Sequence, residues 1–170
     1  MKGTDLVLIA ALVSLIVVTA CCISWWYQLK VECIDYLKLA GDAPTVEKAY
    51  EFLSKCMSYV ERKGITSGNS GIIFHPPRAD LEIWYGQIRG ARDTAKVILG
   101  KDGSGSLDQL ERDNALMKIR EVLLDHGESG TTVTKPPWLS WYPHQGAILV
   151  WWVLTFVILV VGVLVSFIYR

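Results

Sequence analysis

Four cysteines and three histidines are the residues of this chain whose side chains could do chemistry. Cys21 and Cys22 are adjacent in an apolar run, where a thiol serves most simply as a small apolar filler. Cys33 and Cys56 lie on the inward stripes of two successive predicted helices, at similar distances from the turn between them. This pair could form a disulfide, and two buried free thiols are the alternative.

The histidines could hold a metal ion, because imidazole is a common ligand. His126, however, fits the C-terminus of a predicted helix, where a cation is favoured. His75 and His144 each adjoin a proline in a loop. The sequence contains no Cys-x-x-Cys, P-loop or nucleophile-elbow motif. We therefore expect a non-enzymatic protein with no catalytic residues, no cofactor and no metal site.

Two long apolar segments are expected to position the region of the chain that lies between them. Residues 146–169 form an uncharged run of 24 residues, and residues 6–24 form one of 19. A helix of roughly 20 apolar residues crosses a bilayer, so both segments predict membrane spans. A cleaved signal peptide, or a lipoprotein signal ending at Cys21, is the alternative for the first segment. Asp5 and the length of the run favour a retained span.

Aromatic residues flank both segments on the side of the intervening region. Tryptophan and tyrosine favour the headgroup layer of a bilayer. We therefore predict six membrane-interface anchors and expect membrane lipids as a partner. The anchors are Trp25, Trp26, Tyr27, Trp138, Trp141 and Tyr142.

Four amphipathic stripes, separated by glycine and proline, predict four helices between the spans. Their expected bounds are 28–40, 45–63, 79–99 and 106–126. The third helix has the most regular pattern, with Asp80 as its predicted N-cap. Its apolar residues are Leu81, Trp84, Ile88, Ala91, Ala95 and Ile98. Gly86 and Gly90 each cost this helix about 1 kcal/mol relative to alanine, so we expect a compensating close backbone contact.

The fourth helix is predicted to bury a broad apolar face that includes Leu110 and Met117, with Asn114 inside the pattern. Residues 131–145 are expected to form an extended connector, because Pro136 and Pro137 forbid a helix there. The loop after the second helix carries an apolar tip. This tip could cap the helices, or it could contact lipid or a neighbouring subunit. It consists of Ile72, Ile73 and Phe74.

The predicted fold class is an all-α membrane protein with two transmembrane helices flanking an up-down four-helix bundle-like module. The expected domains are residues 1–27, 28–130, 131–145 and 146–170. This layout resembles that of bacterial chemoreceptor sensor modules, which place a four-helix bundle between two spans. The resemblance implies a sensor.

Charge excludes one class of partner. The chain has 17 basic and 17 acidic residues. Setting aside Lys2, Arg170 and Asp5 leaves 15 basic and 16 acidic residues between the spans. A nearly neutral module offers no electrostatic field for nucleic acid, so no nucleic-acid partner is expected.

We expect an accessory or structural subunit of a larger membrane assembly, homo- or hetero-oligomeric, whose helical module covers the extracytoplasmic face of its partner. A membrane-anchored sensor that signals laterally is one alternative, and a viral or secretion membrane component is another. A Cys33–Cys56 disulfide would place the module in an oxidising space. Both termini would then be cytoplasmic, as in a bacterial-type inner-membrane protein.

Overall fold

The computed structural model describes residues 3–102, 108–127 and 130–168 of the 170-residue chain. The chain is mostly helical, at 77%. It divides into two compact units. The first combines Met1–Tyr27 with Ser140–Arg170, and the second is Gln28–Leu139. The predicted connector 131–145 is therefore divided between the two units.

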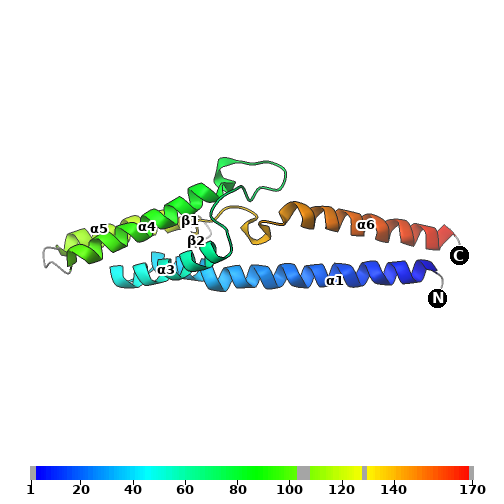
Figure 1. The fold of residues 1–170 in the computed structure, drawn as a ribbon, viewed down its shortest axis with the longest axis horizontal. Coiled ribbons are helices and arrows are strands. Elements are labelled where there is room, and N and C mark those ends of the chain that lie inside the picture. Colours follow the sequence, from blue (N-terminus) through cyan, green and yellow to red (C-terminus); the bar gives the residue numbers. More distant parts are fainter. Residues whose placement is uncertain (1–2, 103–107, 128–129, 169–170) are drawn as a thin grey trace. The chain divides into compact units, whose positions relative to one another are not determined.

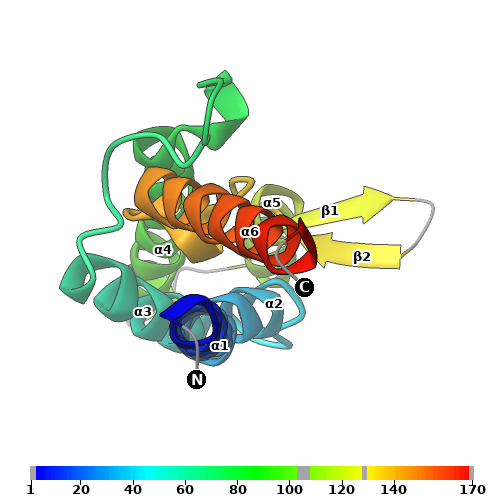
Figure 2. The ribbon, with the colours of Figure 1, turned by 90° about the vertical axis from the view of Figure 1, so that its right-hand side faces the viewer.

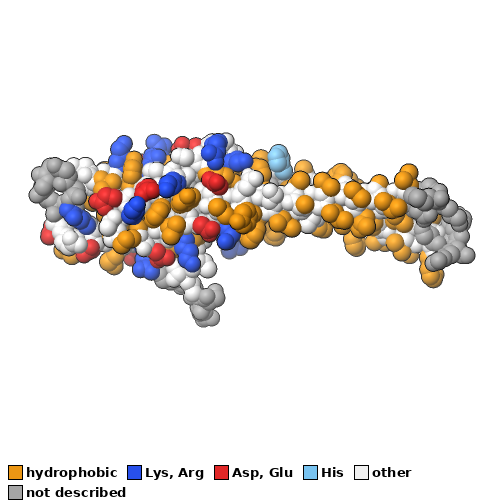
Figure 3. All heavy atoms as spheres, turned by 90° about the horizontal axis from the view of Figure 1, so that it is seen from below, with side chains coloured by type: hydrophobic (Ala, Val, Ile, Leu, Met, Phe, Trp, Pro, Cys, Tyr) orange, Lys and Arg blue, Asp and Glu red, His pale blue; other side chains and the backbone are white. Residues whose placement is uncertain are grey.

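Two apolar helices make up most of the first unit: α1 (Gly3–Leu29) and α6 (Gln145–Ile168). Both are long and apolar enough to cross a membrane. Hydrophobic side chains cover them on the face drawn in Figure 3, whereas the charged side chains on that face belong to the second unit. The predicted helices are confirmed over residues 6–24 and 146–168, and position 169 lies outside the described residues.

Within the first unit, α1 and α6 meet at Gly162. A Cβ atom built on Gly162 would lie 2.5 Å from Cδ2 of Leu8, so this glycine allows a close approach. The hydroxyl of Thr155 donates to the carbonyl oxygen of Trp151 at 2.8 Å. Such bonding to the preceding turn satisfies a polar group that an apolar surrounding would otherwise leave unpaired.

Helices also dominate the second unit. α2 packs on α3, α3 on α4, α4 on α5, and α5 on α2; Figures 1 and 2 show these elements from two directions. The predicted helix at 28–40 comprises the end of α1, a π-helical turn and α2. The elements are the π-helical turn Lys30–Ile34, α2 (Asp35–Gly41), α3 (Val46–Arg62), α4 (Leu81–Asp102) and α5 (Gln109–Leu123).

Short polar side chains set the N-termini of α3 and α4. The hydroxyl of Thr45 accepts a hydrogen bond from the backbone N–H of Lys48 at 3.4 Å. The carboxylate of Asp80 accepts from the backbone N–H groups of Glu82 at 2.8 Å and Ile83 at 3.3 Å. These oxygens satisfy donors that have no partner inside a helix. The N-cap predicted at Asp80 is confirmed.

The core of the second unit follows the predicted stripes closely in α3 and α4. All six apolar residues of the α4 pattern are buried, from Leu81 to Ile98. In α3, Leu53 and Val60 are fully buried, as is Cys56. Cys33 faces Cys56 from the π-helical turn, and the two form a disulfide with a Cα–Cα distance of 4.3 Å.

The prediction for the fourth helix was wrong for part of its buried face. Leu110 is 65% exposed and Met117 is 60% exposed, and Asn114 also faces solvent. The buried residues are Ala115, Ile119 and Leu123. Their four-residue spacing gives a narrow strip, because α5 contacts α2 and α4 along one side. The predicted start of this helix, Ser106, lies outside the described residues.

The all-α prediction was also wrong, at the end of the fourth helix. β1 (Leu124–Gly127) pairs antiparallel with β2 (Gly130–Val133), as Figure 2 shows. His126 is therefore in a strand and not at a helix end. The β-branched residues 131–133 favour an extended backbone. Gly130 begins the return strand at φ 110°, a conformation that glycine tolerates.

Candidate interaction surface

The outward side of α4 carries a stripe of apolar and small residues, here called the α4 outer stripe. It consists of Ile83, Gly86, Gly90 and Val97, all exposed. Their spacing of three, four and seven residues places them on one side of a helix. Ile83 is 53% exposed and Val97 is 58% exposed, although both are large hydrophobic residues. The opposite side of α4 carries its buried heptad residues.

The two glycines of the stripe do not make the close contact that the sequence led us to expect. Apart from their chain neighbours and the adjacent backbone of α4 itself, no described atom lies within 4 Å of a Cβ built on Gly86 or Gly90. The reason is that both positions face away from the side of α4 that packs on α3 and α5. Their helix-propensity cost, about 1 kcal/mol each, therefore has no compensating contact within the described chain.

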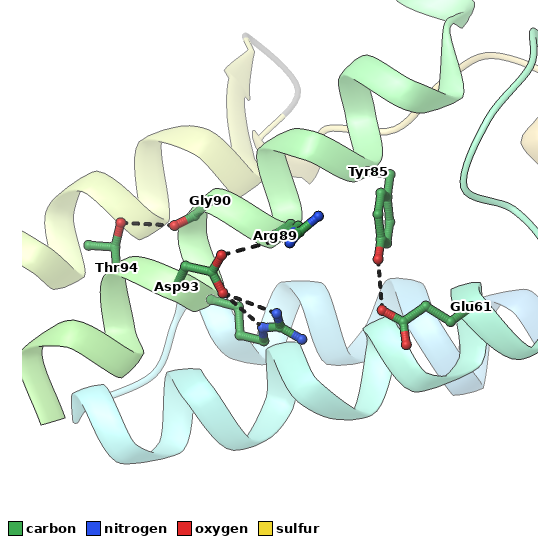
Figure 4. A network of polar contacts seen from close by, with 7 residues as sticks. Glu61, Tyr85, Arg89, Gly90, Asp93 and Thr94 are labelled. Carbon is green, nitrogen blue, oxygen red and sulfur yellow. Dashed lines mark hydrogen bonds and ion pairs between the residues drawn. The ribbon is translucent and has the colours of Figure 1, made fainter. Parts of the chain in front are cut away.

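The flank of α4 nearest α3 is held by polar contacts (Figure 4). The phenol of Tyr85 donates a hydrogen bond of 2.7 Å to the carboxylate of Glu61 in α3. This hydrogen bond raises the pKa of Tyr85, because a phenolate would lose the bond and face a carboxylate. The contact joins α4 to α3 on a side of α4 that lies away from the outer stripe.

Charged side chains border the stripe and pair with each other. Asp93 accepts from Arg92 at 3.0 Å and lies 3.8 Å from Arg89. The hydroxyl of Thr94 donates to the carbonyl oxygen of Gly90 at 2.9 Å (Figure 4). These exposed ion pairs contribute little stability. They do satisfy the polar groups around Gly90, so a helix packed there would bury few unpaired polar atoms.

A second surface feature is an open groove of about 610 Å³ along the α2–α3 hairpin. Tyr59 in this groove is 2% exposed, and its hydroxyl has no hydrogen-bond partner among the described residues. Burial raises the pKa of Tyr59. Lys55 lies 5.4 Å from the centroid of the Tyr36 ring. Lys55 and Lys48 lower the pKa of Glu51 to about 2.

The predicted interface anchors fall in both units. Trp25, Trp26 and Tyr27 end the part of α1 that belongs to the first unit, with Trp26 47% and Tyr27 60% exposed. Trp141 and Tyr142 lie in the same unit, where a 3₁₀ turn (Leu139–Trp141) precedes α6. Trp138 belongs to the second unit and is 52% exposed.

The predicted apolar tip leaves two of its three residues in solvent. Ile72 is half-buried, whereas Ile73 is 70% and Phe74 is 81% exposed. In the described structure, Ile73 and Phe74 therefore stand away from the helices that they were expected to cap. This observation removes capping as the simplest explanation of the two side chains.

Sequence reasoning missed two contacts that join distant segments. The indole N–H of Trp84 donates to the carbonyl oxygen of Thr134 at 3.0 Å, 50 positions away. Ser70 makes a similar bond to Pro137, described below. Side-chain-to-backbone bonds of this range have no local spacing that could reveal them.

Neither a protein family, a curated protein nor a solved structure matches the chain.

Proposed function

We propose that this protein is a non-enzymatic accessory or structural subunit of a larger membrane protein assembly. The α4 outer stripe is the observation that carries the proposal. Ile83 and Val97 leave apolar area in water, which favours burial against a partner. Between them, Gly86 and Gly90 leave the helix backbone open, and small residues in this spacing allow a second helix to approach closely.

In this proposal α1 and α6 cross the membrane, and α2 to α5 form a four-helix bundle beside it. The ring of contacts through α2, α3, α4 and α5 supports a bundle. The disulfide and the buried heptad face of α4 stiffen this bundle, so it would present the outer stripe as a rigid surface. A brace between subunits needs such rigidity, because a soft surface would lose entropy on binding.

The disulfide also supports an orientation. Cys33 and Cys56 are bonded in the second unit, whereas the free cysteines Cys21 and Cys22 lie in the apolar part of α1. Disulfides persist in oxidising spaces and are rare in the cytosol. We therefore place the bundle outside the cytoplasm, with both termini cytoplasmic, as in a bacterial-type inner-membrane protein.

A membrane-anchored sensor is the second candidate, favoured by the groove at Tyr59. A buried hydroxyl without a partner costs about 1–3 kcal/mol, and a ligand that accepted its hydrogen bond would recover part of that cost. The Tyr59→Phe variant separates the two functions. In a structural subunit it should raise the free energy of unfolding and leave assembly intact. In a sensor, the same variant should instead lose the response to the ligand bound in the groove.

The main test compares the double variant Gly86→Leu/Gly90→Leu with Gly100→Leu. Gly100 also lies in α4 and also has open space around it, so the control carries the same chemical change near the C-terminal end of the helix, ten residues beyond Gly90. We expect the full-length protein, solubilised in mild detergent, to retain stoichiometric partners in the wild type and the control. The double variant should lose them, as measured by native mass spectrometry.

One result would contradict the proposal. In it, the wild-type chain is monomeric in mild detergent and has the same oligomeric state as the double variant. Circular dichroism of each variant checks that the helices are formed. Exposed leucines are compatible with a helix, so misfolding is not the expected cause of lost assembly.

A further inference from the structure

The apolar tip at Ile73 and Phe74 lies in a loop whose base is fixed by hydrogen bonds. The side chain of Asn69 accepts from the backbone N–H of Gly71 at 2.8 Å. A Cβ on Gly71 would collide with the carbonyl oxygen of Phe74, so the chain turns tightly there. The tip is therefore held outward by its own backbone and not by packing of its side chains.

The base of this loop is also tied to the segment that leads into α6. The Ser70 hydroxyl donates to the carbonyl oxygen of Pro137 at 2.6 Å. Pro137 precedes Gln145, the first residue of α6, by eight positions. An extended chain covers roughly 3.5 Å per residue, so Pro137 lies within about 30 Å of the start of α6. The connecting chain is therefore short enough for the loop to reach the surface of a bilayer that α6 crosses.

The charge of the loop suits an anionic lipid surface. Residues 64–79 contain no acidic residue, and Arg78 and His75 are exposed beside the tip. The nearest carboxylate in sequence after the loop, Asp80, accepts the N-terminal N–H groups of α4. Ile73 and Phe74 are the most exposed large hydrophobic residues among the described part of the second unit. Apolar side chains with adjacent basic groups bind at the headgroup boundary.

We propose that Ile73 and Phe74 insert into the headgroup–acyl boundary of the bilayer that α6 crosses. The inference rests on the membrane crossing proposed above and adds a third point of attachment. Burying both side chains removes apolar area from water, which favours insertion. The loop would then give the second unit a contact with the membrane surface in addition to its covalent connections to α1 and α6.

The test uses the full chain in nanodiscs with the Cys33–Cys56 disulfide intact. Cys21 and Cys22 are first replaced by serine, and single cysteines are introduced by Phe74→Cys, Met117→Cys or Val157→Cys. Each is labelled with an environment-sensitive fluorophore. Lipids that carry a quencher on the acyl chain report insertion, and iodide reports exposure to water. Met117 is the matched control, because it is a large hydrophobic residue of α5 that is 60% exposed and lies outside the α4 outer stripe. Val157 is the control within α6.

We expect the probe at position 74 to be quenched by lipid severalfold more than the probe at 117, and to be shielded from iodide. Replacing anionic lipid with neutral lipid should reduce this difference. Equal iodide quenching at 74 and 117 would overturn the inference. Shielding from both quenchers would also overturn it, in favour of a protein contact. Loss of lipid quenching at 157 would instead show that α6 does not cross, and would refute both proposals.

Discussion

The hydroxyl of Ser70 joins two segments that are 67 positions apart, through its 2.6 Å hydrogen bond to the carbonyl oxygen of Pro137. Ser70 is fully buried, and its hydroxyl also lies 3.2 Å from the carbonyl oxygen of Ala79. Its backbone N–H donates to the same Ala79 oxygen at 2.9 Å. One small side chain therefore fixes the loop after α3 and the connector before α6 to each other.

Replacing this serine should be costly. The Ser70→Ala variant leaves the Pro137 carbonyl without its donor, and we expect the free energy of unfolding to fall by about 1–3 kcal/mol. Ser58→Ala is the matched control, because that exposed hydroxyl bonds to the carbonyl of Ser54 in the same helix. Its effect should stay within about 0.5 kcal/mol. Thermal unfolding in detergent, followed by near-ultraviolet circular dichroism, measures both; equal losses would contradict the assignment.

Two glycine-to-alanine changes are expected to act in opposite directions. A Cβ on Gly41 would lie 2.7 Å from Cγ and Cδ1 of Leu124, so Gly41→Ala should destabilise the chain by about 1–3 kcal/mol. Gly90→Ala meets open space and should stabilise the isolated chain by up to about 1 kcal/mol. Unfolding of the two variants in the same detergent gives the comparison. A stabilising Gly41→Ala would show that Leu124 can move away.

Chemical reduction of the Cys33–Cys56 disulfide should lower the free energy of unfolding of the wild-type chain. The bond closes a loop with a sequence separation of 23, which corresponds to about 3 kcal/mol in the chain-entropy description. The measurement is the unfolding midpoint with and without a thiol reductant. The Cys21→Ser/Cys22→Ser variant should show the same sensitivity, since neither residue is bonded. Four reactive thiols in the unfolded, unreduced protein would refute the bond.

Glu51 should make stability depend on pH in acid. Hydrogen bonds from Lys55 and Lys48 lower its pKa from 4.5 to about 2 in the folded chain. A depressed carboxyl pKa stabilises the fold above the unfolded value, and the contribution disappears as pH falls from about 4.5 to about 2. The difference in melting temperature between wild type and Glu51→Gln should therefore shrink over this range. Because all three groups are exposed, added salt should also reduce the difference.

The buried residues of a helix could be predicted from the sequence where the helix buries a single, regularly spaced face. The α4 heptad and the Asp80 cap depend on residues a few positions apart, so the sequence contains all the information needed to place them. Which residues of α5 are buried depends on how many neighbouring helices pack against it. Leu110 and Met117 fit an apolar pattern, but the helices that contact α5 reach only the strip through Ile119.

The hairpin and the outer stripe were harder to predict, for different reasons. Leu124 continues the apolar pattern of α5, so the change to a strand depends on pairing with Val133, which no helical periodicity reveals. Gly86 and Gly90 were recognised as unusual, but the side of α4 that they occupy follows from where α3 and α5 pack. The spacing of Cys33 and Cys56 on either side of one interhelical turn made a disulfide geometrically reasonable but left two free thiols as the alternative, and the structure shows the bond.

The Cys33–Cys56 bond also decides how a mechanical load would travel through the chain. The first apolar helix leads directly into Cys33, and the bond connects that position to the middle of α3. A tensile force applied along α1 would pass to α3 through sulfur and bypass α2 and the turn before Thr45. In the proposed membrane-spanning arrangement, stretching of the bilayer would load the second unit through this covalent link. Reduction would transfer the same force to the non-covalent packing between α2 and α3.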